Sequence, residues 1–201
     1  MSIQNPFPTS FLSRELLTKP LNRRVALGRL GGGVLSAAAV ALMAGQDNVA
    51  KAHSSGDTAN DVTILNTALS AELEAIAAYQ VGAESGLLSK GVLGVAVQFQ
   101  GHHKEHADVL ADTVKKLGGT PSEAKQEYMF PTDQLKSEAD VLQFAAGLER
   151  GAVSAYLGAV PLFDNRDLAK AAASILGDEA MHWAVLRQAL GENPVPSAFV
   201  S

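Results

Sequence analysis

Carboxylate and imidazole side chains recur at regular spacing in four separate segments of this sequence. A glutamate lies in the first and third segments, and a pair of residues three apart lies in the second and fourth. Residues three apart on a helix occupy neighbouring positions of one face, so both members of a pair can point the same way. The candidate metal ligands are Glu72, His103, His106, Glu149, Glu179 and His182.

These residue types allow the binding of divalent metal ions. One glutamate from each of two helices, with Glu-x-x-His from each of two others, is the ligand set of dimetal carboxylate sites in helix bundles. Carboxylates and imidazoles suit iron, manganese and zinc, whereas the absence of cysteine removes thiolate ligands and disfavours copper(I). We predict one or two ions of iron or manganese, with zinc as a further candidate.

Four long helices are predicted to position these residues. The second ends at Gly118-Gly119, and the third begins at Ser137, whose partner three residues on is Asp140, a variant of the capping box. No segment shows the sustained alternation of a strand, so the fold class is all-α, an antiparallel four-helix bundle. The predicted ranges are Thr58–Ala83, Lys90–Leu117, Ser137–Pro161, and Asp164 or Asn165 to the stop at Gly191–Pro194, with a short turn at Glu123–Tyr128 in the long connection.

Each predicted helix carries an apolar series at spacings of three and four residues, interrupted near its middle by an acid or an imidazole. A buried, ionised carboxylate without a partner is strongly unfavourable, so four such interruptions at similar depth indicate a shared cation. The series are Leu65, Leu69, Glu72, Ile76 and Tyr79; Val92, Ala96, Phe99, His103, His106 and Leu110; Leu142, Ala145, Glu149, Val153, Tyr156 and Val160; and Leu168, Ala172, Ile175, Glu179, His182 and Leu186.

Two tyrosines repeat the same relation to the lone glutamates. Tyr79 follows Glu72 by seven residues, and Tyr156 follows Glu149 by seven. Seven residues are two helical turns, or about 10 Å along the helix axis. We therefore expect both tyrosines to pack in the core rather than to take part in redox chemistry.

The set of motifs resembles the ferritin-like superfamily, and more narrowly the exported bacterial ferritin-like domain proteins. The resemblance covers nearly all of residues 57–192. It implies a ferritin-like bundle, a buried metal site, and oxidative or drying stress as the setting. The residues that carry it are Glu72 with Tyr79, His106, Glu149 with Tyr156, and Glu179-Ala180-Met181-His182.

One position departs from the family pattern. His103 stands where the second helix of the family has a glutamate, three residues before His106, that often bridges two metals. The three remaining carboxylates carry three negative charges, against four positive charges on two divalent ions, so such a site would have a net charge of +1. A single ion or an asymmetric pair is therefore an alternative. His102 could substitute as a ligand, and a metal-free set of buried Glu–His pairs is a further reading.

Charge and composition narrow the class of partner. Six of the 16 Lys and Arg and two of the 21 Asp and Glu precede residue 53, so the rest carries 10 basic and 19 acidic residues, a net of -9. An acidic body without a basic stripe argues against nucleic acid as a partner. Metal ions and small oxygen species are the expected partners, and a homodimer is left open.

The first 52 residues resemble a twin-arginine export signal. Arg23-Arg24 precedes a glycine-rich, weakly apolar run, and Ala50-Lys51-Ala52 offers a small-x-small cleavage site. The apolar stretch from Leu30 to Ala44 is shorter than the roughly 20 residues of a spanning helix, and an uncleaved anchor is the alternative. The expected mature protein is 53–201, a bundle with a short C-terminal tail, in the periplasm or outside the cell.

Two functional hypotheses follow from these patterns. The first is a metal-binding protein that acts on ferrous ion, oxygen or peroxide, either as a ferroxidase-like or as a catalase-like oxidoreductase. The second is a structural or protective bundle with a degenerate, metal-free site, which the histidine at position 103 favours. No fifth helix is evident after residue 192, so a ferritin cage is not predicted.

Overall fold

A computed structural model describes residues 55–200 of the chain, of which the side chains are described from Thr58. The predicted export signal and the expected new N-terminus at His53 lie outside this range. The described part is all-helical and contains no strand, which confirms the predicted fold class. Its long helices are α2 (Ser55–Glu84), α3 (Lys90–Lys116), α4 (Glu138–Ala159) and α5 (Arg166–Ala189), with short 3-10 turns η3 (Thr132–Gln134) and η4 (Val160–Leu162).

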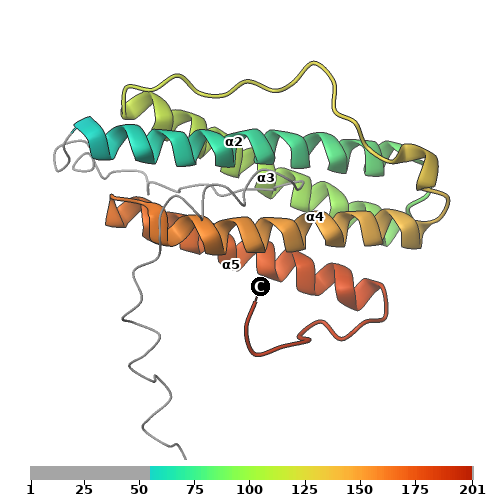
Figure 1. The fold of residues 1–201 in the computed structure, drawn as a ribbon. Coiled ribbons are helices and arrows are strands. Elements are labelled where there is room, and N and C mark those ends of the chain that lie inside the picture. The colour runs from blue at the N-terminus through green and yellow to red at the C-terminus, as the bar shows by residue number, and fades with distance from the viewer. Residues whose placement is uncertain (1–54, 201) are drawn as a thin grey trace, which may run out of the picture. The chain divides into compact units, whose positions relative to one another are not determined.

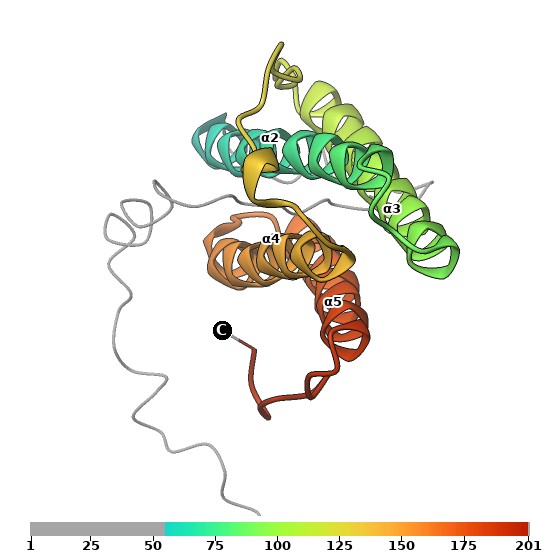
Figure 2. The ribbon, with the colours of Figure 1, turned by 90° about the vertical axis from the view of Figure 1, so that its right-hand side faces the viewer.

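The four helices form two hairpins packed as two layers. Helix α2 pairs with α3, and α4 pairs with α5, as the end-on view of Figure 2 shows. Each hairpin is antiparallel, and the long connection between α3 and α4 runs back along the bundle, so that these two helices point the same way (Figure 1). One long crossover of this kind is the connectivity of ferritin-like bundles.

Local sequence signals account for the helix ends. The Ser137 side chain accepts a hydrogen bond from the Asp140 backbone N–H, and Asn165 accepts from the N–H groups of Asp167 and Leu168. Helix α3 ends where Gly118 adopts a positive φ of 80°, and a Cβ at Gly119 would lie only 2.7 Å from Val62 of α2. The paired glycines thus end one helix and permit close contact with the next.

The long connection differs from its prediction in one respect. The turn expected at Glu123–Tyr128 is wrong: this segment is extended, and the only turn of helix in the connection is η3. Asn66 of α2 fixes the extended chain, because its Nδ2 donates to the Thr120 carbonyl at 2.9 Å and its Oδ1 accepts from Ser122 N–H at 2.7 Å. An extended chain advances about 3.3 Å per residue against 1.5 Å in a helix, which suits a connection along the bundle.

The hydrophobic core has two parts with the polar residues between them. Along every helix the candidate ligands lie between side chains of one cluster and side chains of the other. The larger cluster includes Leu65, Leu69, Leu110, Val114, Tyr156, Leu168 and Ile175, and the smaller consists of Tyr79, Phe99, Leu142, Ala146 and Leu186. The two apolar clusters therefore enclose a polar layer at mid-height.

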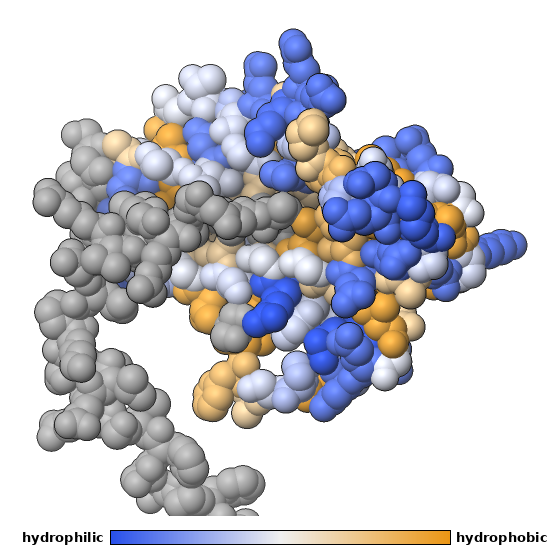
Figure 3. Space-filling view, turned by 45° about the vertical axis from the view of Figure 1, so that its right-hand side comes forward, coloured by the Kyte–Doolittle hydropathy of each residue, from blue (hydrophilic) through white to orange (hydrophobic). Residues whose placement is uncertain are grey.

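The surface of the described part is mixed in character. The face in Figure 3 is a mosaic of hydrophilic and hydrophobic residues rather than one continuous apolar area. Among the described helices, none combines the length and the hydropathy that a bilayer-spanning segment requires.

Candidate metal centre

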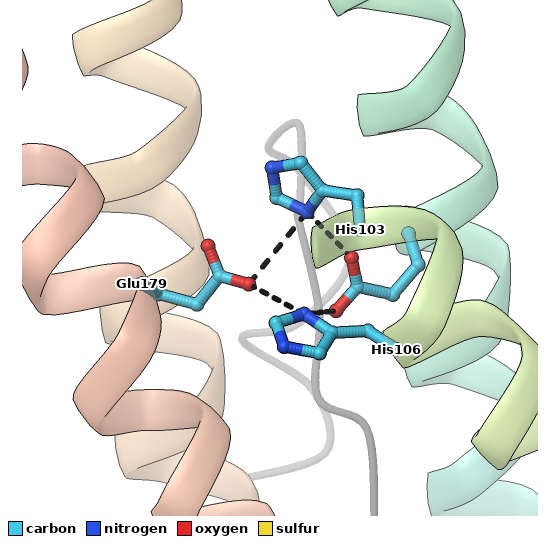
Figure 4. Close-up of side chains that lie close together, drawn as sticks. His103, His106 and Glu179 are labelled. Carbon is cyan, nitrogen blue, oxygen red and sulfur yellow. Dashed lines mark hydrogen bonds and ion pairs between the residues drawn. The ribbon is translucent and has the colours of Figure 1, made fainter. Parts of the chain in front are cut away.

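The structure brings all six candidate ligands into one layer between the helices. Glu72 comes from α2, Glu149 from α4, and the others from α3 and α5. Figure 4 shows His103 and His106 on α3 facing Glu179 on α5 across the space between the helices. All are buried except His106, whose side chain is 13% exposed. The apolar series of the sequence therefore faces the interior, with its polar members meeting at one level.

The six residues form two overlapping groups of donors that could each hold a metal ion. In the first group, His106 Nδ1 lies 3.3 Å from Glu72 Oε1 and 3.3 Å from Glu179 Oε1. In the second, His182 Nδ1 lies 3.5 Å from Glu149 Oε1 and 3.6 Å from Glu179 Oε2. The two oxygens of Glu179 thus face two different histidines, and Glu179 and His103 belong to both groups.

Several buried atoms in this layer have no hydrogen-bond partner within the described protein. They are His106 Nδ1, His182 Nδ1, Glu149 Oε2 and both carboxylate oxygens of Glu179. Four of the five lie in ion-pair contacts of 3.3–3.6 Å that lack hydrogen-bond geometry, whereas buried polar atoms are almost always hydrogen-bonded, so this layer requires an explanation. Carboxylate oxygens and deprotonated imidazole nitrogens are electron-pair donors of the types that bind divalent cations, and these atoms belong to the two groups described above. The residues present therefore fit a metal site.

His103 lies between two glutamates and contacts each through a different nitrogen. Its Nδ1 lies 2.7 Å from Glu72 Oε2, and its Nε2 lies 3.3 Å from Glu149 Oε1. Burial opposes the imidazolium, but the carboxylates of Glu149 and Glu72 outweigh it and raise the pKa of His103 well above its usual value. Without metal, a protonated His103 balances part of the buried negative charge.

The other titratable groups of the layer are shifted as well. Burial, with the carboxylates of Glu149 and Glu72, raises the pKa of Glu179 to about 7. Burial lowers the pKa of His106 and of His182, but their carboxylate contacts outweigh it and raise the pKa of each to about 9. The imidazoles of His103, His106 and His182 are thus protonated in neutral solution when no metal is present.

The two repeated tyrosines pair across the bundle rather than along their own helices. Tyr79 of α2 donates a hydrogen bond to Glu149 Oε1 of α4, and Tyr156 of α4 donates to Glu72 Oε1 of α2 at 3.1 Å. Both are buried in the core, as expected, and each also orients one glutamate of the candidate site. Burial and the neighbouring Glu149 raise the pKa of Tyr79 well above 10, which keeps it a neutral donor.

Replacing either tyrosine by phenylalanine is expected to destabilise the metal-free protein. Tyr79→Phe and Tyr156→Phe each remove a buried hydrogen bond to a charged group, a loss of about 1.5–3 kcal/mol. Denaturant unfolding would measure it. The half-buried loop residue Tyr128 supplies the matched control: its hydroxyl only accepts a solvent-exposed hydrogen bond from the Lys125 N–H, so Tyr128→Phe is expected to change stability by at most about 1 kcal/mol. Equal effects at all three positions would show that the tyrosine–glutamate contacts do not matter.

Asp178 is a site residue that the sequence reasoning missed. Its Oδ2 lies 3.3 Å from His182 Nε2 and 3.4 Å from His106 Nε2, on the side of each imidazole that faces away from the inner groups. His102 Nδ1 lies 3.2 Å from the same oxygen, so His102 joins this outer cluster rather than the inner groups. Asp178 could have been identified from the sequence by its spacing of four residues from His182, which places the two side chains on one face of the same helix.

The structure is a four-helix bundle with one long crossover, and it encloses carboxylates and imidazoles at mid-height. These features are typical of proteins that hold metal ions between their helices. The chain belongs to the ferritin-like domain family, whose sequence pattern matches residues 60–192. A solved structure with a similar fold is that of a conserved hypothetical protein, rv2844, from Mycobacterium tuberculosis. It is 25% identical, with a TM-score of 0.61 over 73% of this chain and 99% of that one. No curated protein matches the sequence.

Proposed function

We propose that this protein binds one or two divalent ions of iron or manganese between its helices and acts on ferrous ion, oxygen or peroxide. The observation that carries the proposal is the set of five buried donor atoms without hydrogen-bond partners, all directed at two positions that share Glu179. Zinc would suit the same donors, so their chemistry alone does not select the metal.

The proposed roles divide between the two inner groups. Glu72 and His106 would hold one ion, and Glu149 and His182 the other, with Glu179 common to both. Bound iron or manganese would supply redox chemistry toward oxygen or peroxide. Tyr79 and Tyr156 would keep Glu149 and Glu72 in place, and the surrounding apolar clusters would exclude bulk water.

An apolar cavity beside the centre supports oxygen as a reactant. It has a volume of about 120 Å³, and its wall includes Tyr79, Ala96, Leu142 and Leu186. Walls this apolar favour small apolar molecules over water. Molecular oxygen is such a molecule, and Tyr79 both lines the cavity and donates its hydroxyl hydrogen bond to Glu149.

Metal analysis of protein purified from its native compartment tests the proposal. We expect between one and two equivalents of iron or manganese per chain, and a metal-soaked crystal to show anomalous scattering beside Glu179. A Glu179→Ala, His182→Ala double variant is the control, because it removes donors from both inner groups. Near-zero iron, manganese and zinc in the wild-type protein would reject the metal-binding function.

Metal affinity is expected to rise with pH. His106 and His182 have pKa values of about 9 without metal, so both are protonated at pH 8 and must lose a proton to bind an ion through Nδ1. Binding should release about two protons per chain, and affinity should rise up to tenfold per proton per pH unit until about pH 9. Titration calorimetry in buffers of different ionisation enthalpy measures the protons. Affinity that is independent of pH from 6 to 9 would contradict the role of these histidines.

A second candidate function is a structural or protective bundle without metal. The observation in its favour is that His103 contacts both Glu72 and Glu149 and can supply the positive charge that these carboxylates need. In that case chelator treatment would leave the thermal unfolding temperature unchanged. The metal-binding protein is expected instead to lose stability when its ions are removed.

We also propose that residues 1–52 direct export and that the mature protein acts in the periplasm or outside the cell. The support is the sequence pattern of Arg23-Arg24, the glycine-rich run and the small-x-small site. An Arg23→Lys, Arg24→Lys variant is expected to remain in the cytoplasm, as cell fractionation would show, and Lys19→Arg is the control. Normal export of the double variant would contradict a twin-arginine signal.

A further inference from the structure

Three side chains outside the inner groups form a third cluster of metal-binding type. His102 Nδ1, His182 Nε2 and Asp178 Oδ2 are mutual neighbours, at 2.9 Å between the two nitrogens and 3.2 and 3.3 Å from each nitrogen to the oxygen. His102 and Asp178 are partly exposed, with 33% and 23% of their side-chain surface accessible. This outer cluster of His102, Asp178 and His182 therefore reaches solvent, whereas the inner groups are buried except at His106, which is 13% exposed.

The spacing within the outer cluster suits the ligands of a single ion. An ion with bonds of about 2.0–2.1 Å in tetrahedral geometry holds its ligand atoms about 3.3–3.4 Å apart. The distances from Asp178 Oδ2 to the two imidazole nitrogens are within about 0.2 Å of this value. The two nitrogens, at 2.9 Å, would have to move apart by about 0.5 Å when an ion binds. Two imidazoles and one carboxylate with a fourth position open to water form a three-ligand site of a common type.

A hollow in the surface reaches this cluster at Asp178. It lies between α3 and α5, has a volume of about 360 Å³, and is lined by Asp178, His106, Glu105 and Met181 among others. Two of these residues are acidic, and carboxylates that line a concave surface raise the local concentration of cations. Asp178 belongs to the hollow and to the outer cluster, and His106 belongs to the hollow and to the first inner group.

His182 connects the outer cluster to the inner groups. Its Nε2 faces His102 and Asp178, and its Nδ1 faces Glu149 and Glu179. A neutral imidazole has one proton and one free electron pair, so it can bind an ion on one side only. An ion on Nε2 requires the proton on Nδ1, and an ion on Nδ1 requires the proton on Nε2. His182 can therefore bind an ion in the outer cluster or in the second inner group, but not in both at once.

We propose that His102, Asp178 and His182 form an outer site that receives divalent transition-metal ions from solvent and transfers them to the buried centre. The inference rests on the proposed metal-binding function and adds a route to it. As the ion moves from Nε2 to Nδ1, the imidazole proton moves from Nδ1 to Nε2. There it is donated in a hydrogen bond to Asp178 Oδ2 or His102 Nδ1, which the ion has vacated. The outer site empties as the inner site fills.

The rate of metal loading tests this route. Co²⁺ is the probe, because its binding is followed by visible absorbance, and the variant is His102→Asn in the otherwise complete protein. Asparagine retains a polar group able to hydrogen-bond His182 but is a poor ligand for Co²⁺. We expect loading in a stopped-flow experiment to slow about tenfold or more, while the final amount of Co²⁺ bound stays that of the wild type. Gln98→Ala, an exposed change one turn earlier on α3, is the control and should load normally.

The remaining outcomes would contradict either the proposed transfer of ions from the outer site or the proposed metal binding by the buried centre. An unchanged loading rate would overturn the proposal. A weaker equilibrium affinity at an unchanged association rate would also overturn it, because it would make His102 a positioning residue for His182 only. If wild-type protein bound Co²⁺ solely in a form that His102→Asn removes, the outer site would stand and the proposed function of the buried centre would fail. No binding of Co²⁺ to the wild type would overturn both.

Discussion

Replacing Glu179 by glutamine is expected to abolish metal binding at both inner positions and, at the same time, to stabilise the metal-free protein. Glu179 belongs to both inner groups, and its two oxygens face two different histidines. A neutral amide of the same shape offers a weak oxygen ligand and no charge. Metal content should therefore fall from one or two equivalents to no more than the outer site of His102, Asp178 and His182 retains, as measured by elemental analysis after equilibrium dialysis.

The gain in stability of the metal-free variant follows from the pKa of the carboxyl group that is removed. Burial and the carboxylates of Glu149 and Glu72 raise the pKa of Glu179 from 4.5 to about 7 in the folded protein. A raised carboxyl pKa means that ionisation opposes folding, an effect that grows from about pH 4.5 to about pH 7 and is complete above it. At about pH 10, above the pKa values of about 9 at which His106 and His182 lose their positive charge, Glu179→Gln should raise the free energy of unfolding by on the order of 1–3 kcal/mol.

The opposite signs of the two effects make this experiment decisive. Glu74→Gln is the control, because Glu74 lies on α2 outside both groups and should affect neither quantity. If Glu179→Gln retained full metal content, Glu179 would not be the shared ligand. If it destabilised the metal-free protein at pH 10, where His106 and His182 are neutral, the carboxylate of Glu179 would be satisfied by the protein itself, and the argument from unpartnered atoms would fail.

Replacing His103 by glutamate is expected to make the fold depend on metal. Without metal, this change removes the imidazolium between Glu72 and Glu149 and adds a fourth buried carboxylate. Loss of one partner from a buried ion pair costs about 3–5 kcal/mol, a large share of the 5–15 kcal/mol that stabilises a typical domain. With two divalent ions bound, four carboxylates balance their charge, so the same variant should be restored.

Thermal unfolding with and without Mn²⁺ measures this dependence. We expect Mn²⁺ to raise the unfolding temperature of His103→Glu by roughly 10 °C more than that of the wild type. His103→Gln is the matched control: it removes the imidazolium without adding a carboxylate, so it should be destabilised without metal but gain no extra rescue. If metal-free His103→Glu were as stable as the wild type, His103 would not act as the internal cation.

Most of the fold could be predicted from the sequence, because several residues determine the structure of the backbone next to them. Gly118-Gly119 ends α3 and Ser137 begins α4 where predicted, because glycine and serine act on the backbone next to them. Glu72, Glu149 and Glu179 are buried as predicted, because helical periodicity places them on the same face as the neighbouring leucines. These are local relations within one helix, and they do not depend on the partner helix.

What the sequence could not decide is which side chains of different helices meet. Tyr79 and Glu72 share a helix, yet Tyr79 donates to Glu149 on α4, because packing brings those two atoms together. The sharing of Glu179 by two groups and the cluster of Asp178 with His102 arise in the same way. Spacing along a chain fixes the face and the height of a residue on its own helix. The relative rotation and offset of the helices decide its partners, and these are set by packing of whole surfaces.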